Sequence, residues 1–245
     1  MENAARGCAI GCIRDPERVM SDHTVVAFDR ELDELGRRIA EMGDVASQMV
    51  SDAVNALSNG DSGLAQSVLE RDPRLDKLQR EVEDQAILAI ARRQPVARDL
   101  REVLGAVRIA GDFERVGDLA KNIAWRATMF ESGTRPTHTT VRLRQMSDLA
   151  SDMLIDVVDA YARRDAMRTE IVWLRDAAID SMEDSIFRDL LTQMMENPRN
   201  ITACAHLLFC TKDIEGIGNH AARIAESVHY AVTGRAMDLV QPEPR

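Results

Sequence analysis

Apolar residues along the first part of the chain recur at alternating steps of three and four positions. The series runs through Phe28, Leu32, Leu35, Ile39, Met42, Ala46, Met49, Ala53 and Leu57. This spacing is typical of a long helix packed in a left-handed bundle. We expect the helix to end at residues 58–61, because Asn59 and Gly60 tolerate left-handed backbone angles.

Two further helices are predicted in the first half of the chain. One runs from about Leu64 to Arg93 and stops before Pro95, and the next runs from Arg98 to about Phe130. Residues 132–138 (SGTRPTH) then form the longest turn-like segment in the body of the chain. Turn-forming residues between periodic segments favour a domain boundary at this point.

The second half of the chain repeats the first. At an offset of 104, nine of the twenty residues from 42 to 61 are identical, and a second set of matches occurs at an offset of 101. The second set is Asp112/Asp213, Glu114/Glu215, Gly117/Gly218, Ala120/Ala221, Ile123/Ile224, Ala124/Ala225 and Gly133/Gly234. We therefore predict an all-α fold, a tandem repeat of two three-helix bundles with six long helices. The expected units are a disordered extension (1–22), bundles at 23–133 and 138–234, and a tail (235–245).

The amino-acid composition favours helices and argues against several classes of function. Aromatic residues make up only 4% of the 245 residues, and the formal charge is −10 with no Lys/Arg cluster clear of acidic neighbours. Binding to a nucleic-acid backbone is therefore not expected. The sequence contains no run of about 18 apolar residues, so no membrane-spanning helix is predicted. The N-terminus lacks the apolar segment of a secretion signal, and the cysteines form no Cys-x-x-Cys pair, so we expect a cytoplasmic protein.

Acidic residues spaced four apart occur at equivalent places in both copies. The pairs are Asp72 and Asp76, Glu114 and Asp118, Asp176 and Asp180, and a remnant in Glu215 and Asn219. Side chains four apart on a helix differ by only about 40° around its axis, so they stand one above the other. If the second and third helices of a copy are neighbours, their carboxylates converge on a groove beside the buried seam.

Like charges at this spacing cost a few tenths of a kcal/mol, and the repeated cost suggests a counter-charge. A hard cation with oxygen ligands would supply it. Gly117 and Gly218, each about 1 kcal/mol worse than Ala in a helix, would let a neighbouring helix approach closely. The alternative is a solvated acidic face, neutralised locally by Arg115 or Arg71. Because Asn219 carries no charge, the second site should be the weaker one.

Three segments together resemble the PhoU family, cytoplasmic regulators of bacterial phosphate uptake. They are ERVGDLAKNIA (114–124), QPVARDLR (94–101) and IEGIGNHAARIAESVHYAVTG (214–234), and the resemblance covers about residues 24–238. It implies two three-helix bundles side by side. It also implies metal ions on acid-x-x-x-Asp motifs, with one surface site on each bundle.

Carried over by position, the resemblance assigns metal ligands in both bundles. They are Asp72, Asp76, Glu114 and Asp118 in the first bundle, and Asp176, Asp180 and Glu215 in the second. Asn122 matches the motif's usual Asn, and Arg115 and Asn219 are supporting residues. The second copy departs from the motif at Gly216, Asn219 and Arg223, which argues against metal there. The identity of the metal stays open among iron, zinc, magnesium and manganese.

The resemblance further implies a negative regulator of the phosphate-starvation response. Such a protein links the ATPase subunit of the phosphate ABC transporter to the sensor histidine kinase PhoR, and holds the kinase off when phosphate is plentiful. It would bind no nucleic acid and reach the membrane only through its partners. A homodimer is compatible with the sequence.

Two other classes compete with this interpretation. A di-iron oxidase would need two Glu-x-x-His motifs, and the chain has one, from Glu226 to His229. P-loop, GxSxG and GxGxxG motifs are absent, so we expect no enzymatic activity. The remaining alternative is a structural interaction module whose acidic faces bind no metal.

Overall fold

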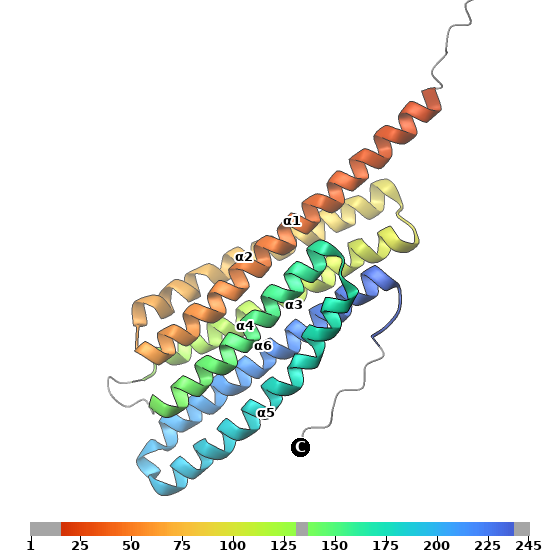
Figure 1. Cartoon of the computed structure of the whole chain (residues 1–245). Coiled ribbons are helices and arrows are strands. Elements are labelled where there is room, and N and C mark those ends of the chain that lie inside the picture. The colour runs from red at the N-terminus through yellow and green to blue at the C-terminus, as the bar shows by residue number, and fades with distance from the viewer. Residues whose placement is uncertain (1–15, 131–136, 238–245) are drawn as a thin grey trace, which may run out of the picture.

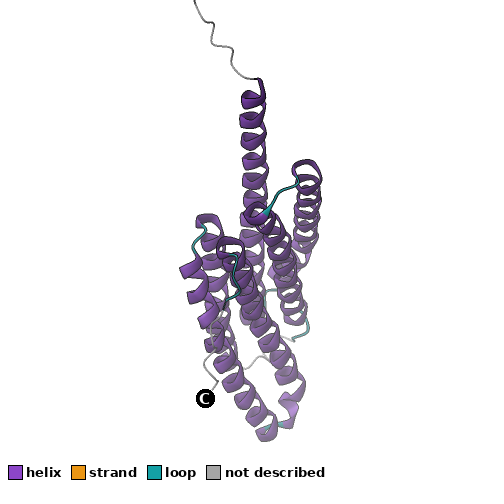
Figure 2. Cartoon of the chain, turned by 90° about the vertical axis from the view of Figure 1, so that its right-hand side faces the viewer, coloured by secondary structure: helices purple, strands orange, loops and turns teal. Residues whose placement is uncertain are grey.

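The computed structural model describes residues 16–130 and 137–237. Its helices are α1 (Pro16–Asn59), α2 (Ser62–Arg93), α3 (Ala97–Ala127), α4 (Thr137–Arg163), α5 (Ala166–Glu196) and α6 (Ile201–Thr233), with a short 3-10 turn, η1 (Pro198–Asn200), before α6. Within the described ranges there is no strand, as Figure 2 shows. The all-α prediction is therefore confirmed.

The six long helices form two bundles that lie side by side (Figure 1). Helices α1, α2 and α3 pack against one another, and α4, α5 and α6 do the same. The bundles meet where α1 lies against α4 and α3 lies against α6. This arrangement confirms the tandem repeat of three-helix bundles.

The predicted seam of α1 forms part of the core. Leu35, Ile39 and Met42 are buried, as is the rest of the series toward the C-terminal end of the helix. Met146 and Met153, the counterparts of Met42 and Met49, are buried as well. One continuous cluster of buried apolar side chains runs through both bundles, so burial at equivalent positions follows the duplication.

Equivalent residues also begin the second helix of each bundle. Asp61 Oδ1 accepts a hydrogen bond from the backbone N–H of Leu64 at 2.9 Å, and Asp165 Oδ1 accepts one from Arg168 at 3.1 Å. Such caps satisfy backbone donors that a helix start leaves free. Gly60, just before the first cap, has a φ of 74°, which confirms the predicted left-handed turn.

The N-terminal boundary differs from the prediction. Helix α1 already begins at Pro16, so residues 16–22 are helical and do not belong to a disordered extension. Proline is favoured at the first position of a helix, and no helix breaker follows before Phe28. The rest of the predicted extension (1–15), most of the predicted boundary and residues 238–245 lie outside the described residues. Among the residues that the structure describes, none of the helices contains the continuous apolar stretch that a membrane span requires.

Candidate functional site

The carboxylates of the first bundle meet between α2 and α3. Asp72 and Asp76 come from α2 and Glu114 and Asp118 from α3, and all four are partly buried. We call this set of four the acidic crease. The side chains flank the fully buried Leu75 and Phe113 rather than replacing them in the core, as the helical spacing predicted.

Lys121 on α3 lies inside the acidic crease. Its Nζ is 2.7 Å from Asp72 Oδ2 on α2 and 2.6 Å from Asp118 Oδ1 one turn earlier on α3. The ammonium therefore bridges the two helices through two charge-assisted hydrogen bonds. Lys121 thus supplies a counter-charge at the place where the acidic spacing predicted one, although the sequence pattern did not identify this residue. Lys121 follows Asp118 by three residues, and opposite charges at this spacing form ion pairs on a helix. The sequence therefore contained the information needed to predict this contact.

Neighbouring charges alter the protonation of the crease. Burial raises the pKa of Glu114 and the charge of Asp118 raises it further, while Arg115 opposes them and Asp76 adds to the rise. Burial alone would lower the pKa of Lys121, but its hydrogen bonds to Asp118 and Asp72 outweigh that effect and raise it. Arg115 lies 3.3 Å from Asp118 and 3.6 Å from Glu114. Asn122 is exposed one turn beyond Asp118.

The two repeated glycines allow close helix contacts, as predicted. A Cβ on Gly117 would stand 2.4 Å from Leu75 Cδ2, and one on Gly218 would stand 2.6 Å from Ile179 Cδ1. Leu75 and Ile179 are themselves equivalent at the offset of 104. In both bundles the second helix thus places an apolar side chain against a glycine of the third.

The second-bundle acids are arranged differently. Asp176 is buried, whereas its counterpart Asp72 is partly exposed. Glu215 Oε1 accepts a hydrogen bond from Asn219 Nδ2 at 3.0 Å. Lys212, one turn before Glu215 on α6, lies 3.4 Å from Glu183 and 3.9 Å from Glu215. Asp180 is partly buried. The two sets of residues therefore occupy equivalent positions in the repeat but form different ion pairs.

Two departures of the second copy from the family motif lie at the contact between the bundles. A Cβ on Gly216 would stand 3.1 Å from Leu119 of α3. Arg223 Nε lies 3.6 Å from Asp112 Oδ1 on α3, and His220 Nδ1 lies 2.8 Å from the same oxygen. Gly216 and Arg223 therefore have a structural reason that is independent of metal: they fit α6 against α3.

Whether the carboxylates fit a metal ion can be judged from their geometry. Within the described parts of the chain, no group of three or more His, Cys, Asp or Glu side chains is placed to hold one. In the first bundle, Lys121 lies between two of the four assigned ligands. The acidic crease in this conformation does not fit a metal centre, and the assigned ligand set stays a prediction.

The single Glu-x-x-His motif does not form a joint site. Glu226 accepts a hydrogen bond from Trp173 Nε1 at 2.9 Å, while His229 lies 3.3 Å from the hydroxyl of Thr169 and is buried. The two side chains thus have separate partners on α5. Their contacts account for the motif through the packing of α6 against α5.

An apolar surface on α5 was missed by sequence reasoning. Met167, Ile171 and Leu174, spaced along one side of the helix, are 77%, 52% and 46% exposed. We call these three the α5 stripe. Their counterparts in the first copy, at the offset of 104, are Gly63, Ser67 and Glu70. The two copies differ here in a way that the sequence already shows: the second copy has apolar residues at the three positions where the first has Gly, Ser and Glu.

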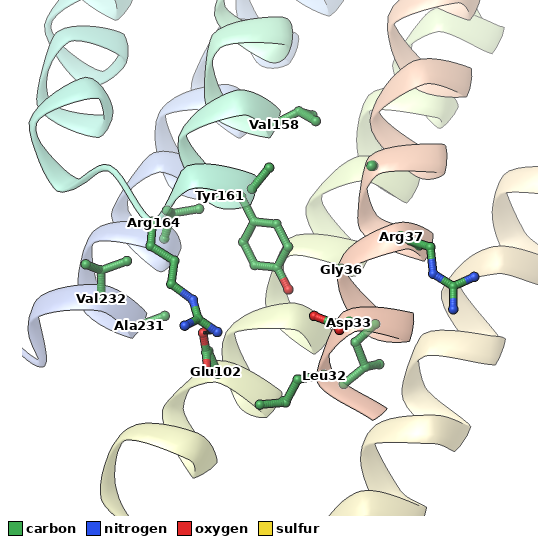
Figure 3. A pocket seen from close by; sticks show the side chains of 14 residues that line it. Leu32, Asp33, Gly36, Arg37, Glu102, Val158, Tyr161, Arg164, Ala231 and Val232 are labelled. Atoms are coloured by element: carbon green, nitrogen blue, oxygen red, sulfur yellow. Dashed lines mark ion pairs between the residues drawn. The ribbon is translucent and has the colours of Figure 1, made fainter. Parts of the chain in front are cut away.

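A cavity of about 530 Å³ lies where α1, α3, α4 and α6 meet. Figure 3 shows the Tyr161 ring directed into it, with the ion pair of Arg164 and Glu102 at its edge. In this ion pair, Arg164 Nη2 lies 2.5 Å from Glu102 Oε1. Burial raises the pKa of Tyr161 to about 12, with the charge of Glu102 adding to the rise. No residue of the acidic crease lines this cavity.

The chain resembles known proteins throughout both bundles. The family model described as the PhoU domain matches residues 39–127 and again 143–228. A phosphate-specific transport system accessory protein PhoU homolog of Rhizobium meliloti is 50% identical over 212 residues, covering 86% of this chain and 90% of that protein. A protein of the same description from Caulobacter vibrioides is 42% identical over 224 residues, covering 91% and 97%.

Solved structures agree with the sequence relatives. The crystal structure of PhoU from Pseudomonas aeruginosa matches with a TM-score of 0.82 and 35% identity, over 85% of this chain and all of that one. The phosphate transport system regulatory protein PhoU from Streptococcus pneumoniae matches with a TM-score of 0.80 and 25% identity, over 86% and 100%. On sequence, duplication and fold alike, the chain belongs to the PhoU family.

Proposed function

We propose that this protein is a negative regulator of the phosphate-starvation response. It would couple the ATPase subunit of a phosphate ABC transporter to a PhoR-type sensor histidine kinase, and keep the kinase inactive when phosphate is plentiful. The observation that carries the proposal is the similarity over nearly the whole chain to proteins described as phosphate transport system accessory proteins. Its site of action would be the cytoplasm, with access to the membrane only through these partners.

The α5 stripe supports a docking role. Its three apolar side chains are exposed on one side of a helix, and burying the part of each that is still exposed contributes roughly 1–2 kcal/mol to association. Exposed apolar surface that recurs along a helix marks an interaction face more often than scattered single residues do. We assign this face to the ATPase subunit, since the transporter is the system for which the relatives are described.

Charge supports protein partners over nucleic acid. The formal net charge is −10, and the basic side chains around the acidic crease are engaged with carboxylates. A phosphate backbone would be repelled by such a surface. The proposed activity is therefore regulation through protein contacts, without chemistry of its own.

Deleting the gene and following phosphate-responsive transcription in phosphate-rich medium tests the proposal. We expect the phosphate-starvation genes to be expressed in the deletion strain and silenced again by the wild-type gene. A variant of the α5 stripe, Ile171→Glu with Leu174→Glu, should fail to silence them. Ile87→Glu is the matched control, because Ile87 is an exposed apolar residue of α2 outside the stripe. Silence in the deletion strain would refute the proposed function.

A further inference from the structure

We infer that Lys121 is the built-in counter-cation of the acidic crease, and that its ammonium occupies the place where a metal ion would have to bind. A metal could then enter the first bundle only by displacing Lys121. The crease thus differs from an open carboxylate site, because part of its negative charge is balanced by the chain itself.

The position of the ammonium is the first support. Nζ lies between carboxylates of two different helices, at 2.7 Å from Asp72 and 2.6 Å from Asp118. Charge-assisted hydrogen bonds of this length are the strong ones. The Lys121 side chain is about one-third exposed, while that of Asp72 is only 16% exposed. The ammonium therefore joins α2 to α3 at the point where their acids converge.

The charge state of Lys121 is the second support. A lysine side chain is positively charged at neutral pH, and the Lys121 ammonium lies against two carboxylates. A divalent ion bound to Asp72 and Asp118 would lie within a few ångströms of this positive charge and be repelled by it. The Lys121 side chain would therefore have to move away from these carboxylates before a metal could bind between them.

The duplication provides the third support within one chain. At the offset of 101, Asp118 corresponds to Asn219 and Lys121 to Ala222. At these two positions the second copy therefore lacks one acid and one base that the first copy has. Loss of both together leaves the charge at these two positions balanced, as expected if Lys121 is matched to Asp118. Lys212 does not replace it, because it lies at 3.4 and 3.9 Å from its acids with a 60% exposed side chain.

The experiment compares wild type with Lys121→Gln in a titration with Mn²⁺ alone, using purified metal-free full-length chain. We expect Lys121→Gln to bind Mn²⁺ at least about tenfold more tightly than wild type, since one repelling charge is removed. Without metal, Lys121→Gln should unfold at a lower temperature than wild type. Mn²⁺ should recover that loss for the variant and change wild type little.

Three further variants make the result specific. Adding Asp118→Asn to Lys121→Gln should abolish the gain in Mn²⁺ affinity. Lys77→Gln removes an exposed lysine of α2 whose partner is Glu81, and it should bind Mn²⁺ as wild type does. Lys121→Arg keeps the charge and should also bind weakly, which preserves the test if Lys121→Gln fails to fold. Equal affinity of wild type and Lys121→Gln, or tight binding by Lys121→Arg, would overturn the inference.

Discussion

The guanidinium of Arg175 on α5 lies 2.6 Å from the carboxylate of Asp156 on α4. The equivalent residues of the first bundle, Arg71 on α2 and Asp52 on α1, form the same ion pair at the same distance. Each pair joins the first and second helices of its bundle. The duplication has thus kept a specific interaction between helices, in addition to a hydrophobic pattern.

This pair predicts how stability responds to acid. Burial alone would raise the pKa of Asp156, but hydrogen bonds from Arg168 and Arg175 outweigh that effect and lower it. A carboxylate with a lowered pKa stabilises the folded state at neutral pH and loses that contribution as pH falls below about 4. Asp156→Asn should therefore lower the free energy of unfolding by roughly 1–2 kcal/mol at pH 7.

Urea unfolding of wild type and Asp156→Asn at pH 7 and pH 3 measures this effect. The difference between them should shrink at pH 3, because the contribution of the ion pair is lost as pH falls from the ordinary aspartate pKa toward the lowered pKa of the folded state. Asp152→Asn, on the exposed side of the same helix, should differ little from wild type at either pH. A difference for Asp156→Asn that stays constant with pH would contradict the ion-pair explanation.

The close contact at Gly117 predicts an unusual response to alanine. In an open helix, Gly→Ala stabilises by up to about 1 kcal/mol. At Gly117 the new Cβ would meet Leu75 at 2.4 Å, and overpacking a core costs about 1–3 kcal/mol. We therefore expect Gly117→Ala to destabilise the protein in thermal unfolding. Gly111→Ala on the same helix, where a Cβ meets nothing within 4 Å, should stabilise it.

Asp213 on α6 predicts a pH dependence at the contact between the bundles. Burial raises its pKa to about 6, and the charge of Arg126, whose Nε lies 3.7 Å away, opposes the rise. A carboxyl group with a raised pKa favours the folded state while it is protonated, and this advantage is lost as pH increases toward and through 6. The guanidinium carbon of Arg126 also lies 4.2 Å from the centre of the Phe209 ring.

Asp213→Asn removes that titration and keeps the shape of the side chain. Between pH 4 and pH 7.5, wild type should lose stability relative to Asp213→Asn, by up to about 3 kcal/mol for a shift of two pKa units. Chemical denaturation of both proteins across this range provides the comparison. Parallel stability curves would show that Asp213 does not titrate as described.

Glu114 predicts a smaller effect within the acidic crease. Its raised pKa, caused first by burial and then by Asp118, means that the ionised carboxylate is disfavoured in the folded state. Glu114→Gln should therefore stabilise the protein at pH 7 by about 0.3 kcal/mol, the typical cost of a like-charge pair four residues apart. The gain should vanish at pH 3, where Glu114 is protonated in wild type. Loss of stability at pH 7 would show that its charge is needed.

Much of the fold was predictable because it rests on periodic patterns. The seam from Leu35 to Leu57 and its repetition at an offset of 104 define which faces are buried and how many bundles there are. The turn at Gly60 and the cap at Asp61 follow from local backbone chemistry. The predicted start of the first helix was wrong, because the helix extends to Pro16, beyond the first residue of the apolar series at Phe28.

The candidate site was only partly predictable. Spacing alone placed Glu114 above Asp118 and beside the core, and the neighbouring helix brings Asp72 to the same crease. Spacing does not determine which long basic side chain reaches into the crease, and Lys121 was therefore overlooked. The burial of Asp176 and the contact of Arg223 with Asp112 depend on how α6 packs, which the one-dimensional pattern does not contain.

A pull-down with the full-length chain, in phosphate-rich and phosphate-poor cells, tests the regulatory account most directly. In phosphate-rich cells, we predict that the chain retains both the ATPase subunit of the phosphate transporter and the sensor kinase. Glu substitutions at Ile171 and Leu174 should release the ATPase subunit, while Ile87→Glu should retain it. Failure of the wild-type chain to retain either protein at high phosphate would contradict the account.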